Sequence, residues 1–308
     1  MLKMKSLRES LLDDDLIIKT DKIIKDEIKA FLKENYNGVI KISKKPNADG
    51  KYEVSSTRKI TVKNRDITSL TNGMFIWSTV DGSFGISYCD SLKSFEGAPE
   101  KVGGNFHCSK CNSLESLKGA PKEIGGDFNC TGCNSLKSLE GAPRIINGYF
   151  RCYDCNSLTS LEGSPEKVRK NFYCTGCNSL KLLEGAPKEI GGDFHCSHCM
   201  SLESLEGASE KVEGGFDCVG CQSLKTLKGA PQIINGGFYC YGCKSLKTLD
   251  GAPKEVGGDF NCNNCDSLKS LEGAPKKVGG NFYCSVCKIQ FTEDDVKQVS
   301  NVRGEINC

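Results

Sequence analysis

The chain has 308 residues, with 41 Lys plus Arg against 39 Asp plus Glu, so its net charge is only +2. This balance gives no bulk electrostatic support for nonspecific binding to nucleic acid or to an anionic membrane. Only 38% of the residues are hydrophobic, no apolar run approaches the roughly 20 residues of a spanning helix, and the start lacks the apolar core of a signal peptide. We therefore expect a soluble protein that is not exported by that route.

The N-terminal region combines a predicted helix with predicted strands. Residues 6–36 place apolar side chains on one helical stripe with Lys and Glu opposite, and Asp21 is the expected N-cap. From residue 38 to about residue 62, the segments GVIKIS, KYEVSS and RKITV alternate as strands, with a hairpin-like turn between the first two.

A 22-residue repeat occupies most of the remaining chain. Its unit reads like SLKSLEGAPKEVGGDFNCTGCN, and each unit contains a Cys-x-x-Cys pair. These paired cysteines are Cys108, Cys111, Cys130, Cys133, Cys152, Cys155, Cys174, Cys177, Cys196, Cys199, Cys218, Cys221, Cys240, Cys243, Cys262, Cys265, Cys284 and Cys287. Self-similarity at a fixed period predicts a solenoid. Partial units at 80–89, with Ile86 at the first cysteine position, and at 302–308 contain the two unpaired cysteines.

Each unit is expected to form one coil. Phe-x-Cys has the alternation of a short strand whose inward face is apolar, and the Gly-Ala-Pro and Gly-Gly steps are turns. Proline and glycines leave no room for a helix, so strand, extended and turn segments should alternate. Roughly ten coils spaced about 4.8 Å apart give a rod or shallow arc about 45–50 Å long.

The C-terminal segment predicts a cap. Thr292 precedes an acidic turn that favours a short helix, and the final strand GEINC follows. We divide the chain into an N-terminal helical and β cap (1–66), the solenoid (67–287), and a C-terminal cap with the last partial repeat (288–308). The caps either simply close the solenoid, or the N-terminal helix is a docking or assembly element.

The repeat resembles a known pattern. Val-x-x-x-Phe-x-Cys-x-x-Cys-x-x-Leu-x-x-Leu is similar to the leucine-rich-repeat pattern L-x-x-L-x-L-x-x-N/C-x-L, with the second cysteine at the Asn/Cys position. The sequence pattern SLxSLEGAPxxVGGxFxC resembles that of cysteine-rich leucine-rich-repeat (LRR-like) proteins predicted in tailed bacteriophages and gut bacteria.

The resemblance implies a fold and an origin rather than an activity. The implied fold is mixed but mainly β: an LRR-like solenoid of about ten 22-residue coils with a small α/β N-terminal cap. The family is mostly without an assigned activity, and its members imply a phage origin. We expect a cytoplasmic location, which means the host cytoplasm or the virion if a phage encodes the protein.

The cysteines have three candidate roles. Consecutive Cys-x-x-Cys pairs are typical of zinc sites, where two pairs supply four thiolates. However, the first cysteine shares the inward strand face with Phe, and Ile86, which cannot ligate a metal, replaces it in the opening unit. We therefore predict a reduced core ladder without a cofactor, in a reducing compartment. Bound zinc or an iron–sulfur centre, and disulfides, stay open as alternatives.

Catalytic residues are not indicated by spacing. The three histidines are His107, His195 and His198, and the first lies four coils from the other two. No Cys/His or Ser/His/Asp constellation can be built from them, so we predict that the protein is not an enzyme. If a metal is found, Cys196, His198 and Cys199 are the candidate ligands.

Outward positions vary between coils, and this variation predicts a recognition surface. The residues on either side of the first cysteine form two columns on the strand face, which is the usual binding face of a leucine-rich-repeat solenoid. The candidate binding residues are Tyr149, Arg151, Tyr153, Tyr173, His195, Tyr239, Tyr241 and Tyr283. Tyrosine and arginine are enriched among the residues that dominate binding energy at interfaces. The alternative is that the tyrosines only stack on one another and favour the strand.

The predicted function is a non-enzymatic scaffold that binds an unknown protein partner through the strand face. A structural virion or assembly component is the first alternative, and a metal-binding or redox Cys-x-x-Cys array is the second. We expect no membrane partner. We also expect no nucleic-acid partner, because glutamate and threonine interrupt the lysine column of the SLKSL turns.

Overall fold

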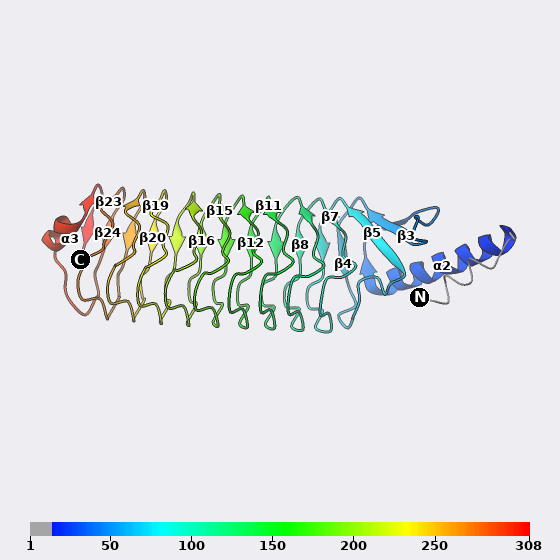
Figure 1. Cartoon of the computed structure of the whole chain (residues 1–308), viewed down its shortest axis with the longest axis horizontal. Coiled ribbons are helices and arrows are strands. Elements are labelled where there is room, and N and C mark those ends of the chain that lie inside the picture. Colours follow the sequence, from blue (N-terminus) through cyan, green and yellow to red (C-terminus); the bar gives the residue numbers. More distant parts are fainter. Residues whose placement is uncertain (1–13) are drawn as a thin grey trace.

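The computed structural model describes residues 14–308, with side chains from Lys19 onward. It is an elongated solenoid with one helix projecting at the N-terminal end and another at the opposite end (Figure 1). These helices are α2 (Asp14–Asn35) and α3 (Glu293–Val299). The part of the predicted N-terminal helix before residue 14 lies outside the described residues. Within the described part of the chain, no helix combines the length and the apolar character needed to cross a bilayer.

Every complete coil contains two short strands, whereas the sequence predicted one. The ten Phe-x strands and three further strands at the ends of the array form one 13-stranded sheet. In spatial order they are β1 (Tyr36–Asn37), β4 (Ile60–Val62), β6 (Phe84–Gly85), β8 (Phe106–His107), β10 (Phe128–Asn129), β12 (Phe150–Arg151), β14 (Phe172–Tyr173), β16 (Phe194–His195), β18 (Phe216–Asp217), β20 (Phe238–Tyr239), β22 (Phe260–Asn261), β24 (Phe282–Tyr283) and β26 (Ile306–Asn307).

The second strand of each complete coil ends on a buried Val or Ile, and the turn that follows it is Gly-Gly in several coils. These strands form three shorter sheets. The first contains β2 (Lys41–Ile42), β3 (Tyr52–Ser56), β5 (Phe75–Val80), β7 (Lys101–Val102) and β9 (Glu123–Ile124). The second contains β11 (Ile145–Ile146), β13 (Lys167–Val168), β15 (Glu189–Ile190) and β17 (Lys211–Val212). The third contains β19 (Ile233–Ile234), β21 (Glu255–Val256), β23 (Lys277–Val278) and β25 (Asn301–Val302).

The coils stack in parallel and in register. Phe128 of β10 pairs with Phe150 of β12, and the same pairing recurs along the array. Apart from β1, which is antiparallel to β4, the long sheet is parallel and has about twelve turns, rather than the ten predicted. The additional turns begin early, because β4 already pairs in parallel with β6. The mainly β solenoid fold is therefore confirmed.

A column of stacked phenylalanines forms the centre of the core. From Phe84 to Phe282, the ring at this position is fully buried or nearly so in every coil. Successive ring centroids lie 4.9–6.1 Å apart, as for Phe194 and Phe216 at 4.9 Å with an interplanar angle of 11°. Two leucine columns and the Val/Ile column enclose the rings. Because no coil can bury these side chains alone, the core forms only by stacking.

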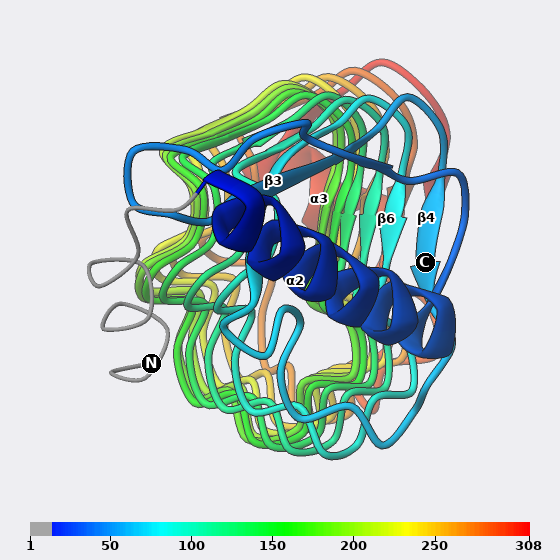
Figure 2. The same ribbon diagram turned by 90° about the vertical axis from the view of Figure 1, so that its right-hand side faces the viewer.

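The N-terminal cap is built from α2 and the first strands. Ile28, Leu32 and Tyr36 are buried in the same core as Trp77 and Phe84. The predicted β2–β3 hairpin is confirmed as an antiparallel pair. In the view along the solenoid, α2 crosses the end of the stacked coils (Figure 2).

The predicted N-cap of this helix is wrong. Asp21 lies inside α2, which already includes Asp14. A single aspartate inside a helix costs only about 0.7 kcal/mol or less relative to alanine, so good helix formers on both sides carry the helix through it. At the other end the prediction is confirmed: Thr292 is the N-cap of α3 and forms a capping box with Asp295.

The phenylalanine column should dominate stability. We expect Phe194→Ala to lower the free energy of unfolding by about 3–5 kcal/mol, because it removes a ring that packs against rings in both neighbouring coils. The measurement is urea unfolding followed by circular dichroism. Met200→Ala in the same coil is the control, since Met200 is 43% exposed, and it should cost no more than about 0.5 kcal/mol. Equal losses in the two variants would contradict the role of the column.

Candidate functional site

The strand face is the outer surface of the 13-stranded sheet. Along each Phe-x-Cys segment, Phe and Cys point into the core, and the residue between them points outward. The outward side chain is half-buried, because copies in the coils above and below pack against it. The strand face therefore presents a row of side chains that remain partly exposed.

An aromatic cluster covers three adjacent coils of this face. It consists of Tyr149, Arg151, Tyr153, Tyr173 and His195. Tyr173 is central: its ring stacks on His195 with centroids 4.6 Å apart, and it lies 5.2 Å from the Tyr153 ring and 6.2 Å from the Tyr149 ring. The Arg151 guanidinium lies 4.5 Å from the Tyr149 ring centroid. Five of the eight predicted binding residues are thus brought together.

Charged groups hold the cluster in place. Arg151 donates to Asp127 at 2.9 Å, and both side chains are at least 75% buried. Burial alone would raise the pKa of Asp127, but hydrogen bonds from Arg151 and the Tyr149 N–H outweigh it and hold that pKa below its usual value. Lys170 lies 4.9 Å from the Tyr149 ring, on the face of the cluster. Burial, with the nearby Tyr173, raises the pKa of Tyr153 to about 12.

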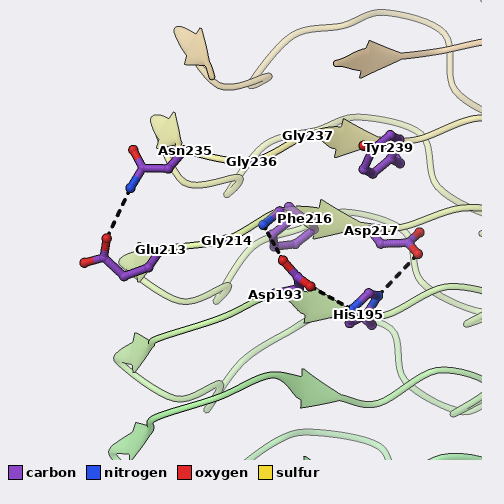
Figure 3. A pocket seen from close by; sticks show the side chains of 11 residues that line it. Asp193, His195, Glu213, Gly214, Phe216, Asp217, Asn235, Gly236, Gly237 and Tyr239 are labelled. Atoms are coloured by element: carbon purple, nitrogen blue, oxygen red, sulfur yellow. Dashed lines mark hydrogen bonds and ion pairs between the residues drawn. The ribbon is translucent and has the colours of Figure 1, made fainter. Parts of the chain in front are cut away.

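His195 joins the cluster to a group of carboxylates. Its two ring nitrogens lie 3.4 Å from an oxygen of Asp217 and 3.6 Å from an oxygen of Asp193 (Figure 3). Burial alone would raise the pKa of Asp217, but hydrogen bonds from His195, Ser197 and the Val219 N–H lower it. The histidine is therefore held by side chains of the preceding turn and of the next coil.

A hollow of about 430 Å³ lies beside His195. In most coils the residue before Phe is Asn or Asp, and its side chain accepts the backbone N–H of the next coil, as Asp193 does from Gly215 at 2.7 Å. Gly215 and Gly237 lack that side chain, which leaves the surface open between Asp193, Asp217 and Tyr239. A Cβ at Gly237 would overlap the Tyr239 ring, so glycine is required for the ring to lie there.

The other three predicted binding residues lie on later coils. Tyr239 lines the hollow, Tyr241 is 44% exposed, and Tyr283 accepts a hydrogen bond from Asn281 at 2.9 Å. They do not join the aromatic cluster. The second outward column is also less open than predicted, because Ser197 and Val219 are buried.

The sequence reasoning missed Asp127, Lys170, Asp193 and Asp217. Asp127 and Asp193 occupy the position before Phe, and Lys170 replaces the second glycine of the turn. Asp217 occupies an outward position of the strand, but the sequence did not reveal its contact with His195. Arg169-Lys170 in place of Gly-Gly, and Gly-Gly-Phe in place of Gly-Asp-Phe at 214–216 and 236–238, were visible departures from the repeat. Reading these departures as a third outward column would have located the hollow.

The paired cysteines form a continuous buried column. Each second cysteine donates its thiol to the carbonyl at the first-cysteine position of the preceding coil, with S···O distances of 3.0–3.5 Å. The first cysteine instead points at a carbonyl that a backbone N–H already occupies, as Cys218 does at Tyr239. The two cysteine positions therefore differ in hydrogen bonding. The thiol of the second cysteine donates to a carbonyl at the end of the strand, whereas the carbonyl beside the first cysteine already accepts a backbone N–H.

The candidate metal ligands do not converge. Cys196 and Cys199 are fully buried, whereas His198 is exposed, has a left-handed backbone with φ of 56°, and lies over Gly220. Burial raises the pKa of Cys196, which favours the thiol over the thiolate that a metal requires. Among the side chains that the structure describes, from Lys19 onward, no group of three or more His, Cys, Asp or Glu has a metal-binding arrangement.

Comparison with known proteins adds little. No family model matches the sequence, and no curated protein matches it. A leucine-rich repeat protein from Bacteroides ovatus ATCC 8483 is similar at 14% identity, over 88% of this chain and 90% of that chain, with a TM-score of 0.34. At that TM-score the likeness carries no argument, so the parallel β solenoid rests on the strand pairing described above. The phage origin implied by the sequence pattern of the repeat stays a prediction.

The two cysteine positions should differ in their tolerance of valine. We expect Cys221→Val to be less stable than Cys218→Val by about 1–3 kcal/mol, because only the former removes the thiol that pairs with the Cys196 carbonyl. The Val219 N–H cannot replace it, since it is bonded to Asp217. Urea unfolding of both variants makes the comparison, and both carry the same added bulk. Equal stabilities would contradict the hydrogen-bonding role.

The strand-face carboxylates should make stability depend on pH in the acid range. Asp127 and Asp217 have lowered pKa values in the folded state, so their contribution is present above the unfolded value of about 3.9 and is lost as pH falls through the folded pKa. Relative to wild type, the Asp127→Asn/Asp217→Asn variant should be less stable at pH 6, and the difference should shrink by pH 3. Urea unfolding across this range is the measurement. Asp250→Asn, at an exposed position, should not show this convergence.

Proposed function

We propose that this protein is a non-enzymatic scaffold whose strand face binds a partner protein. The fold supports this proposal in a general way. Repeat solenoids present extended surfaces that are used for recognition, and stacking of the coils leaves the outward positions free to vary.

The aromatic cluster is the observation that carries it. Tyr149, Tyr153 and Tyr173 form one group of half-buried rings, with Arg151 and Lys170 against their faces. The rings are already ordered by contact with one another, so a partner that covers them loses little additional side-chain entropy. Stacking between the tyrosines, which was the alternative explanation, therefore also prepares them for binding.

The hollow extends this surface with a different charge. The aromatic cluster carries Lys170 and the ion-paired Arg151 and Asp127, a net single positive charge, whereas the adjacent hollow is lined by Asp193, Glu213 and Asp217. A partner segment that crosses both would need an apolar or acidic part over the tyrosines and a polar or basic part over the hollow. Such a change of charge along one face favours a single orientation of the partner.

An assembly role through the N-terminal helix is the second candidate. The observation that favours it is the position of α2, whose first turns project beyond the stacked coils (Figure 1). Ile23 on this helix is 59% exposed. This role uses a different surface from the strand face, so the two functions can be separated by mutation.

Removing three tyrosines should abolish binding without unfolding the protein. The test variant is Tyr149→Ala/Tyr153→Ala/Tyr173→Ala, which keeps the Arg151–Asp127 ion pair. The control is Arg144→Ala/Ile145→Ala/Lys167→Ala on the outer side of the shorter sheets, where all three side chains are exposed. Quantitative affinity capture from a lysate of the source organism compares wild type and both variants, and thermal melting checks their folding.

We expect one partner to be enriched by wild type and by the control variant, and to be lost from the tyrosine variant. A partner retained by the folded tyrosine variant would contradict the proposal. Loss with the control variant instead would move the binding surface to the outer side of the shorter sheets. Retention by both variants together with loss in a folded Ile23→Glu variant, which changes an exposed position of α2, would favour the assembly role.

A further inference from the structure

A second hollow, also of about 430 Å³, lies in the N-terminal cap. It opens between the last turns of α2, the segment that follows this helix through β1 and β2, and Lys63, which comes directly after β4. None of its lining residues belongs to the aromatic cluster or to the hollow beside His195. The cap therefore has a surface that the strand-face proposal does not use.

The floor of this hollow is apolar. Leu32 and Tyr36 are 6% and 4% exposed. Ile40 and Ile42 are partly buried and pack against the same core. The Tyr36 hydroxyl donates to the Leu70 carbonyl, so the polar atom of this side chain is already hydrogen-bonded inside the protein. These four side chains therefore offer hydrocarbon and ring surface to a bound molecule.

The rim of the hollow is positively charged. Lys29 and Lys33 line it from α2, and Lys63 lines it from the end of β4. Lys29 forms an ion pair with Asp26 at 2.9 Å. Neither Lys33 nor Lys63 forms an ion pair with any residue whose side chain the structure describes. Because the described residues that line the hollow include no Asp or Glu, two ammonium groups at its rim are left without a counter-charge.

The apolar floor and the cationic rim together specify the chemistry of a ligand. A purely polar anion would pair with the ammonium groups but leave the floor exposed to water, and a neutral hydrocarbon would cover the floor but leave the ammonium groups unpaired. A carboxylate on a hydrocarbon chain matches both. The volume lies at the lower end of the roughly 300–1,000 Å³ of small-molecule pockets, which favours a free organic acid over a segment of a protein.

We propose that this hollow binds a free monocarboxylic acid with a medium-length hydrocarbon chain, for which octanoate is the probe. The carboxylate accepts charge-assisted hydrogen bonds from the ammonium groups at the rim, and the hydrocarbon chain lies on the apolar floor. Because the lining residues come from α2, β1, β2 and the end of β4, the bound acid contacts the helix and the strands of the cap together.

The test is isothermal titration calorimetry of the folded full-length protein with octanoate, butyrate and octanol. We expect octanoate to bind at a single site. Butyrate should bind at least about tenfold more weakly, because its shorter chain leaves most of the apolar floor uncovered. Octanol should bind about five- to tenfold more weakly than octanoate, because it brings no charge to the ammonium groups.

Two double variants locate the binding. Lys33→Gln/Lys63→Gln should weaken octanoate binding about five- to tenfold, since it removes the two unpaired ammonium groups. It keeps the hydrogen bond from the Lys63 backbone N–H to the Asn35 carbonyl. The control is Lys22→Gln/Lys44→Gln, which removes the same charge from exposed positions of the same cap and should bind octanoate as wild type does. Thermal melting checks that both variants fold.

Four results would overturn the proposal: no binding of octanoate to wild type, equal affinities for octanoate and butyrate, equal losses in the two double variants, or capture of the protein by phosphatidylglycerol vesicles without binding of octanoate. The last result would make the hollow a site for a lipid surface instead. The comparison of ligands uses wild-type protein, so it tests the proposal even if a variant is unstable. Partner capture by the tyrosine variant is a separate measurement on other residues, so either proposal can fail alone.

Discussion

In-register stacking is the constraint on which the whole structure depends. Each coil presents to the next, about 4.8 Å away, a side chain that must pack well against its own counterpart. Phenylalanine meets this requirement with parallel or tilted rings, and leucine and valine meet it by close contact. The parallel pairing of Phe128 with Phe150 is repeated coil after coil, so one register holds along the array.

The same constraint explains which polar residues repeat. Two lysines stacked in one column repel each other, and the outer column of the shorter sheets instead pairs Lys101 with Glu123 and Lys167 with Glu189 across neighbouring coils. Asparagine can repeat, because its amide donates to one neighbour and accepts from the other, as Asn156 does between Asn134 and Asn178. A cysteine thiol is small enough for the core and still donates to a carbonyl, so it can repeat where asparagine would be too polar.

The surface therefore differs from coil to coil only at the positions that do not repeat. Arg169-Lys170 in place of two glycines brings a cation over Tyr149, and the glycines at 215 and 237 open the hollow beside His195. Neither feature is needed for stacking, since the core beneath is the same as in other coils. The scaffold contributes rigidity and spacing, and these few departures contribute the aromatic and charged groups of the candidate binding surface.

The periodicity predicted the solenoid, the inward Phe and Cys positions and the outward columns, because the apolar side chains recur at the same places in every 22-residue unit. The two end helices were predicted separately, from the apolar stripe of residues 6–36 and from Thr292 with the acidic turn that follows it. The sequence did not predict the second strand of each coil, since two residues are too few to show an alternating pattern. Nor did it predict that helix α2 runs through Asp21, because local propensity and packing against the first coils decide where a helix begins. The contacts between Arg151 and Asp127, and between His195 and Asp217, join residues at least 22 positions apart. The stagger of side chains between neighbouring coils decides such pairs, and only the tertiary structure determines that stagger.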